Sequence, residues 1–125
     1  MLRDTDAIAM LAVKDLATAR TFYEGTLGFD PDPAGQDGMV AYRSGATPIM
    51  VYESAYAGTN QANALAWSVD EEFDTIYKEL TSKDVTFEHY DLPGLTLKGD
   101  VHVADNFKGV WFKDPDGNIL HINGR

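Results

Sequence analysis

The chain has 125 residues, of which 44% are hydrophobic, and it carries 20 acidic side chains against 10 basic ones. The resulting net charge of −10 repels phosphate backbones and anionic membrane surfaces, so neither nucleic acid nor a membrane is an expected partner. Cysteine is absent, which excludes disulfides, thiolate metal sites and a thiol nucleophile, and the length suits a single domain over residues 1–125.

The chain begins with MLRDTD, which lacks an apolar signal region, and no stretch of about 18 apolar residues follows that could span a bilayer. We therefore expect a cytoplasmic protein. Residues 7–13 form an apolar run that is typical of a strand covered on both faces. Asp15 then suits a helix N-cap, and Gly25 or Gly28 suits the end of that helix. The helical stripe between them consists of Leu16, Ala19, Phe22 and Tyr23.

The same strand and helix pattern returns in residues 63–87, where Val69 ends the strand as Val13 does in the first copy. Each copy precedes a predicted hairpin, at residues 39–54 and 108–124, and the small polar residues 56–64 suit a linker. Two βαβββ modules are therefore predicted, module one at about residues 5–55 and module two at about 62–125. The turn from Asp114 to Gly117 has type I turn chemistry, which indicates a structural role.

Two motifs resemble the vicinal oxygen chelate superfamily, namely VKDLATARTFYEGTLGF (13–29) and WFKDPDGNILHI (111–122). This superfamily includes glyoxalase I, extradiol dioxygenases, methylmalonyl-CoA epimerase, fosfomycin-resistance enzymes and bleomycin-binding proteins. The resemblance covers nearly the whole chain and implies an α+β fold in which two tandem βαβββ modules form a half-barrel with a shared groove. It also implies a homodimer. Because this fold hosts several chemistries, the motifs indicate the fold and not the reaction.

The resemblance also implies four positions for a divalent metal, one on the first and one on the last strand of each module. In this chain those positions fall on Ile8, Met50, Ala64 and His121. A catalytic cation needs about three suitable protein ligands, and His121 alone provides one. We therefore expect no metal and no cofactor, with a divalent metal at a substituted site as the alternative.

Strand alternation gives a predicted cavity lining, because every second side chain points to the same face. Ile8 brings Met10, Met50 brings Tyr52, Ala64 brings Ala66 and Ser68, and His121 brings Ile119 and Asn123. The ligand-binding candidates are Ile8, Met10, Tyr42, Met50, Tyr52, Ala64, Ser68, His102, Phe107, Trp111 and His121. For Tyr42 and Trp111 the register leaves the facing open, with core packing as the alternative. His121 is the candidate catalytic residue, against the alternative of a cavity wall residue.

The longer connection in module two, residues 91–107, suits either a lid beside the cavity or an extension of the sheet edge. Phe107 and Leu95 are candidates to close over a ligand. If this segment is extended, Asp100 and His102 share one face, and a wet polar edge is the alternative interpretation. His89 precedes a Pro-Gly turn and is assigned to the surface.

These patterns favour a metal-free binding protein for a small apolar or aromatic molecule, with drug or toxin sequestration as the role. The first alternative is a glyoxalase or dioxygenase type of lyase or isomerase with a substituted divalent metal site at His121. The second is an accessory or interaction protein whose groove is filled by its own side chains. The residues leave open which ligand is bound and whether any reaction is catalysed.

Overall fold

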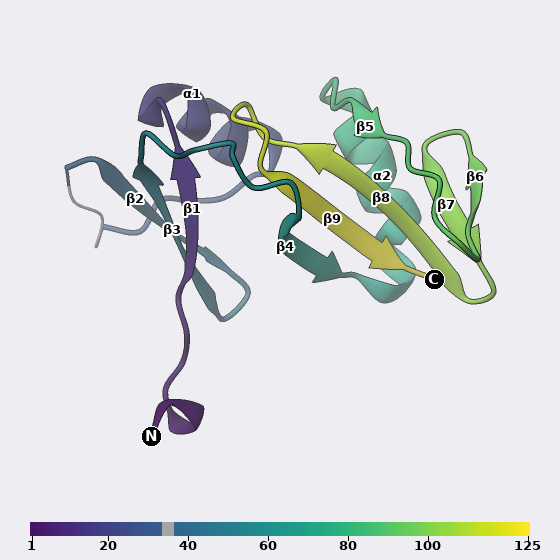
Figure 1. Cartoon of the computed structure of the whole chain (residues 1–125), viewed down its shortest axis with the longest axis horizontal. Helices are drawn as coiled ribbons and strands as arrows, with labels where there is room; N and C mark the ends of the chain where they lie inside the picture. Colours follow the sequence, from purple (N-terminus) through teal and green to yellow (C-terminus); the bar gives the residue numbers. More distant parts are fainter. Residues whose placement is uncertain (34–36) are drawn as a thin grey trace. The chain divides into compact units, whose positions relative to one another are not determined.

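The computed structural model describes residues 1–33 and 37–125, and the chain divides into two compact units, Met1–Thr59 and Asn60–Arg125 (Figure 1). Each unit contains a β-sheet and a helical segment, so the mixed α+β class predicted from the sequence is confirmed. The predicted modules 5–55 and 62–125 fall within these two units. No helix among the described residues has the length and apolar character needed to cross a membrane.

The first unit follows the predicted order of strand, helix and hairpin. Its elements are η1 (Leu2–Asp4), β1 (Ala9–Val13), α1 (Leu16–Arg20), η2 (Thr21–Thr26), β2 (Met39–Ser44) and β3 (Thr47–Glu53). The sheet order is β1-β3-β2, in which β3 is parallel to β1 and antiparallel to β2. Where a βαβββ module would have a further strand, Asp32 forms a single bridge to Ala41, so the described part of this unit has three strands.

Asp15 caps the first helix as predicted, because its carboxylate accepts a hydrogen bond from the Thr18 backbone N–H at 3.3 Å. The α-helical turn of α1 widens into the π-helical turn η2, which continues the helix to Thr26. Gly28 follows in the left-handed region with φ of 79°, so it and not Gly25 is the glycine that ends the helix. Gly25 lies inside η2.

The core of the first unit lies between its sheet and the helical segment. Tyr42 is 2% exposed and packs against Tyr23 and Phe29, with ring centroids 6.1 and 5.6 Å away. Its hydroxyl donates a hydrogen bond to Glu24 Oε2 at 2.8 Å. Burial, followed by this contact with a carboxylate, raises the pKa of Tyr42. The residue therefore enters the core as a neutral hydrogen-bond donor.

The second unit has a larger sheet, with a hairpin added at one edge. Its elements are β4 (Asn63–Ser68), η3 (Asp70–Glu72), α2 (Phe73–Ser82), β5 (Phe87–Glu88), β6 (Thr96–Lys98), β7 (Val101–Ala104), β8 (Phe107–Lys113) and β9 (Ile119–Gly124). The sheet order is β4-β9-β8-β7-β6, and β5 pairs with β8 as well. In Figure 1 the β6 and β7 hairpin stands beside β8, opposite β9 and β4.

One face of the second sheet, which we call the helix face, packs against α2. Phe112 and Leu120 are fully buried there, and Phe87 bridges Phe112 to Tyr77 of α2 with ring centroids 6.0 and 5.2 Å apart. At the end of β9, a Cβ on Gly124 would lie 2.3 Å from the Asp70 backbone oxygen, so only glycine allows this close approach to η3.

The turn between β8 and β9 is structural, as its sequence indicates. Asp114 is buried, and its Oδ1 accepts hydrogen bonds from the backbone N–H groups of Asp116 and Asn118, both at 2.9 Å. Asn118 Nδ2 donates to Asp114 Oδ2 at 2.8 Å. Gly117 completes the turn with φ of 90°. The turn fixes how β8 and β9 pair, and this pairing positions the residues described next.

Candidate functional site

The second sheet presents a set of aromatic and polar side chains on the face opposite α2, which we call the open face. The strand register places Ala66, His121 and Trp111 in one row across β4, β9 and β8. The neighbouring row consists of Ser68, Asn123, Gly109 and His102 across β4, β9, β8 and β7. Sequence alternation predicted that Ser68, His121 and Asn123 share a face, and the register confirms it.

The centre of the open face is a stack of two rings. Trp111 and His121 are directly opposite each other on β8 and β9, with ring centroids 4.1 Å apart and planes at 18°. Trp111 is 9% exposed and His121 is 7% exposed. Phe107 extends the stack, with its ring 6.5 Å from His121 at 26°. The three rings form one aromatic cluster, in which Trp111 and His121 are buried, and we call it the aromatic stack.

A chain of hydrogen bonds fixes the orientation of His121. Its Nδ1 donates to the Val110 carbonyl oxygen at 3.0 Å, which leaves Nε2 to accept a hydrogen bond from Asn123 Nδ2 at 3.1 Å. The Asn123 Oδ1 atom in turn accepts from the Ser68 hydroxyl at 2.9 Å. Burial lowers the pKa of His121, so the neutral ring that this network requires is favoured.

The edge of Trp111 is held by further contacts. Its Nε1 donates to Asn63 Oδ1 at 3.2 Å. Sequence alternation had placed Ala64 on this face, but an irregularity in the β4 register between Asn63 and Leu65 brings Asn63 to it instead. On the other side, the buried ring of His102 meets Trp111 edge-on, with centroids 4.8 Å apart. His102 is 1% exposed, so the wet polar edge considered for it is wrong.

Gly109 lies beneath the aromatic stack. A Cβ at this position would lie 2.9 Å from Phe107 Cζ and 3.1 Å from His121 Cε1. The missing side chain therefore allows Phe107 and His121 to approach each other over the strand. This role could not be predicted from the sequence, because the contact depends on Phe107, two positions earlier, and on His121 of the neighbouring strand.

In the first unit, the predicted lining residues share one face of their sheet. Met10 pairs with Met50 and Ala12 pairs with Tyr52, so Met10, Met50 and Tyr52 lie on the face opposite the helix. Ile8 is exposed just before β1. Tyr42 is on the other face, in the core, which corrects its placement among the ligand-binding candidates. Its β2 neighbour Ala41 pairs with Met50 and occupies the open-face position.

The four positions implied for a divalent metal do not fit one. Ile8 and Ala64 have no donor atom, and Met50 offers only a soft thioether. Both ring nitrogens of His121 are engaged with Val110 and Asn123. Across residues 1–33 and 37–125, no three His, Cys, Asp or Glu side chains are grouped closely enough to hold a metal ion. We derive no metal-assisted chemistry from this donor set.

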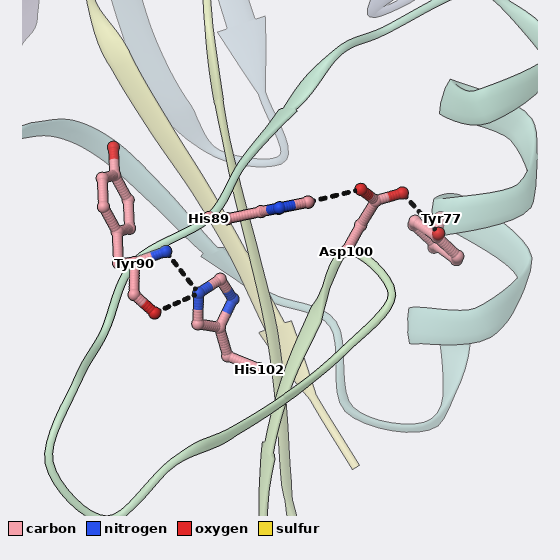
Figure 2. Close-up of polar contacts among 5 residues, drawn as sticks. All are labelled: Tyr77, His89, Tyr90, Asp100 and His102. Atoms are coloured by element: carbon pink, nitrogen blue, oxygen red, sulfur yellow. Dashed lines mark hydrogen bonds and ion pairs between the residues drawn. The ribbon is translucent and has the colours of Figure 1, made fainter.

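The longer connection of the second unit extends the sheet edge, because residues 96–104 form the β6 and β7 hairpin. The residues before it make two side-chain contacts that the sequence did not predict, and Figure 2 shows both. His89 and Tyr77 bind the two oxygens of the Asp100 carboxylate, each at 2.8 Å. Asp100 lies in the turn before β7, and the predicted shared face with His102 does not form a joint site, since each bonds different partners.

A family model described as the Glyoxalase/Bleomycin resistance protein/Dioxygenase superfamily matches residues 6–122. No curated protein sequence matches the chain.

Solved structures with the same fold include a lactoylglutathione lyase from Agrobacterium tumefaciens (16% identity, TM-score 0.69, 96% of this chain and 93% of that one). A genomically encoded fosfomycin resistance protein from Listeria monocytogenes is similar (14% identity, TM-score 0.67, 95% and 91%). So is an integron cassette protein from the mobile metagenome of a Halifax Harbour sewage outfall (18% identity, TM-score 0.68, 96% and 97%). The match over residues 6–122 confirms the resemblance seen in the two motifs, and the chain belongs to the Glyoxalase/Bleomycin resistance protein/Dioxygenase superfamily.

Proposed function

We propose that the chain is a metal-independent small-molecule-binding protein that captures a flat, largely apolar ligand against the aromatic stack. The observation that carries this proposal is the Trp111 and His121 pair, stacked at 4.1 Å and held in place by hydrogen bonds at both rings. Rigid rings offer a large contact area and lose little conformational entropy when a ligand stacks on them. Drug or toxin sequestration is the role we propose for this binding.

The polar groups near the stack support binding more than acid-base catalysis. Both nitrogens of His121 have partners, and its lowered pKa keeps the ring neutral. A general base needs a free lone pair within reach of the proton that it removes. The Ser68 hydroxyl and the Asn123 amide, by contrast, retain hydrogen-bonding capacity that could orient a polar edge of a ligand.

The net charge of the chain predicts a preference for cationic ligands. At −10 the chain attracts cations, so among flat ligands of similar size a cationic one is favoured in the encounter. N-methylquinolinium, 1-naphthol and 2-naphthoate provide a matched series of cationic, neutral and anionic ring systems. The thermal shift should be largest for the cationic probe and smallest for the anionic one, because the chain is negatively charged. A ligand that binds only the native state stabilises it by about 2.7 kcal/mol at a concentration of 100 Kd, which raises the melting temperature.

The binding experiment uses Trp fluorescence as a second readout. The chain has two Trp residues, so Trp67→Phe leaves Trp111 as the sole reporter, and Trp111→Phe leaves Trp67 as the matched control. We expect the probes to change the fluorescence of the first variant and not of the second. Binding of none of the three probes, or equal changes in both variants, would contradict the proposal.

Metal content separates this function from a lyase, isomerase or dioxygenase activity. Protein purified without a chelator or an affinity tag is analysed for Mn, Fe, Co, Ni and Zn, alongside His121→Ala. We expect substoichiometric metal in both. Stoichiometric metal that His121→Ala loses would overturn the metal-independent proposal and direct substrate screens toward glyoxalase and dioxygenase chemistry.

The proposal includes a homodimer, as the family resemblance implies, and a cytoplasmic location. Light scattering coupled to size-exclusion chromatography tests the dimer directly, since a 13.8 kDa chain and its dimer are easily distinguished. A purely monomeric species at the concentrations used for binding would contradict this part of the proposal and leave the binding test unaffected.

A further inference from the structure

The segment of residues 89–95 connects β5 to β6 at the edge of the second sheet, and its first two residues form hydrogen bonds with Asp100 and His102; we call it the strap. Its attachments are His89, which contacts Asp100 in the turn before β7, and Tyr90, which contacts Trp111 of the aromatic stack. Farther along, a hydrogen bond from Leu95 N–H to the Leu92 carbonyl oxygen at 3.2 Å is internal to the strap. The position of the strap therefore depends strongly on its first two residues.

The first attachment is a clamp on the Asp100 carboxylate. His89 Nε2 lies 2.8 Å from Oδ1, and the Tyr77 hydroxyl donates to Oδ2 at 2.8 Å (Figure 2). Because a carboxylate accepts only, Nε2 carries the proton, and the bond exists whether or not the His89 ring is charged. The hydrogen bonds from His89 and then Tyr77 lower the pKa of Asp100, which shows that both partners favour the ionised form.

The second attachment uses the buried ring of His102. The Tyr90 backbone N–H donates to His102 Nε2 at 3.0 Å, so a side chain of β7 takes the place of a strand partner for the strap (Figure 2). His102 Nδ1 is buried and has no hydrogen-bond partner within the described part of the chain. The ring is thus committed to holding Tyr90 and packing against Trp111.

These two attachments place the Tyr90 ring against Trp111. The centroids of Tyr90 and Trp111 are 5.7 Å apart with planes at 78°, and Tyr90 also lies 6.1 Å from His102. His89 and Tyr90 are adjacent in sequence, so release of His89 from Asp100 removes one of the two attachments and leaves the backbone of Tyr90 held by His102. The hydrogen bonds to Asp100 therefore help to hold the Tyr90 ring against Trp111.

We propose that Tyr77, Asp100 and His89 are positioning residues that hold Tyr90 over the edge of Trp111 and thereby control how a ligand reaches the aromatic stack. The part of this inference that concerns ligand access rests on the proposed binding function. The part that concerns the strap is independent of any ligand, because it predicts the behaviour of Tyr90 and Trp111 in the protein alone.

The test without ligand uses the Trp67→Phe protein, in which Trp111 is the only Trp. Asp100→Ala should raise acrylamide quenching of Trp111 and speed hydrogen exchange of the Tyr90 amide by about ten-fold. The reason is that the charge-assisted hydrogen bond between His89 and Asp100 is lost. Asp91→Ala, an equal charge change at an exposed strap position, is the matched control and should leave both unchanged. Tyr77→Phe keeps the His89 bond and should give a smaller change, which keeps the test valid if Asp100→Ala folds poorly.

The test with ligand measures association of 1-naphthol by stopped flow in the same variants. We expect Asp100→Ala to accelerate association, while Asp91→Ala does not. Unchanged quenching and exchange in both Asp100→Ala and Tyr77→Phe would contradict the claim that these residues hold Tyr90 against Trp111. Faster exchange with an unchanged association rate would overturn its control of access. If the parent binds none of the probes, the binding function fails, whereas the quenching and exchange results still decide the strap.

Discussion

The open faces of the two units differ in chemistry although the strands beneath them pair in the same way. The parallel pair β1 and β3 with antiparallel β2 corresponds to β4 and β9 with β8. Met50 occupies the place of His121, and Ala41 occupies the place of Trp111. One face carries flexible thioethers, and the other carries rings fixed by hydrogen bonds.

The helix faces of the two sheets differ much less. In both units an aromatic ring of the first hairpin strand, Tyr42 of β2 or Phe112 of β8, is buried against aromatic side chains from elsewhere in its own unit. The comparison shows that the core preserves the architecture, while the open face is free to change its chemistry. The fold can therefore carry different side chains at the open-face positions of its two units.

The largest effect is expected where the second unit is packed most tightly. Gly124→Ala should lower the free energy of unfolding by about 1–3 kcal/mol, because its Cβ would lie 2.3 Å from the Asp70 backbone oxygen. Gly25→Ala in η2 is the control, since nothing lies within 4 Å of its Cβ position. Denaturant titration measures the free energy of unfolding of both variants. Equal values would show that η3 shifts to accommodate the added Cβ with no loss of stability.

Substitution at the corresponding positions of the two open faces tests whether binding belongs to the second unit. His121→Ala should weaken binding of 1-naphthol about ten-fold, which corresponds to about 1.4 kcal/mol for the lost stack on Trp111. Met50→Ala should change the affinity much less. Fluorescence titration gives both Kd values, and a greater loss with Met50→Ala would place the ligand on the methionine face instead.

The pH dependence of stability should reveal the buried imidazole of the second unit. The pKa of His121 is lowered in the folded state, so below the unfolded pKa near 6.5 the unfolded chain binds a proton that the folded chain does not. The free energy of unfolding should therefore fall as pH decreases from about 6.5 to the lowered pKa, by at most about 1.4 kcal/mol per pH unit from this group.

His121→Gln removes this titration and keeps a polar side chain of similar length. Urea titrations between pH 7 and pH 5 should show that the wild-type protein loses more stability than His121→Gln over this window. Parallel curves for the two proteins would mean that folding does not perturb the imidazole.

A hydroxyl deletion sharpens the contrast between the two faces of the first sheet. Tyr42→Phe removes the hydrogen bond to Glu24 in the core and should cost about 1 kcal/mol. Tyr52→Phe alters a half-buried ring on the opposite face and should cost less than half as much. Thermal unfolding of the pair measures the difference, and an equal cost would indicate that the hydrogen bond from Tyr42 to Glu24 adds no stability beyond that of the Tyr52 hydroxyl.

Local sequence determined the parts of this protein that depend on neighbouring residues. The strand and helix pattern, the Asp15 cap and the Asp114 turn could all be predicted, because each is set by side chains within a few positions of the backbone that they bind. The absence of ligands for a hard cation at Ile8, Ala64 and Met50 was also readable from the sequence, since it concerns residue type alone.

Tertiary structure decided every feature that depends on pairing between distant residues. Strand register placed Trp111 on the open face and Tyr42 in the core, and an irregularity in β4 exchanged Ala64 for Asn63. The contact between His89, Asp100 and Tyr77 joins three separate elements. A one-residue shift in pairing reverses the face of every side chain on a strand, and alternation within one strand carries no information about its partner.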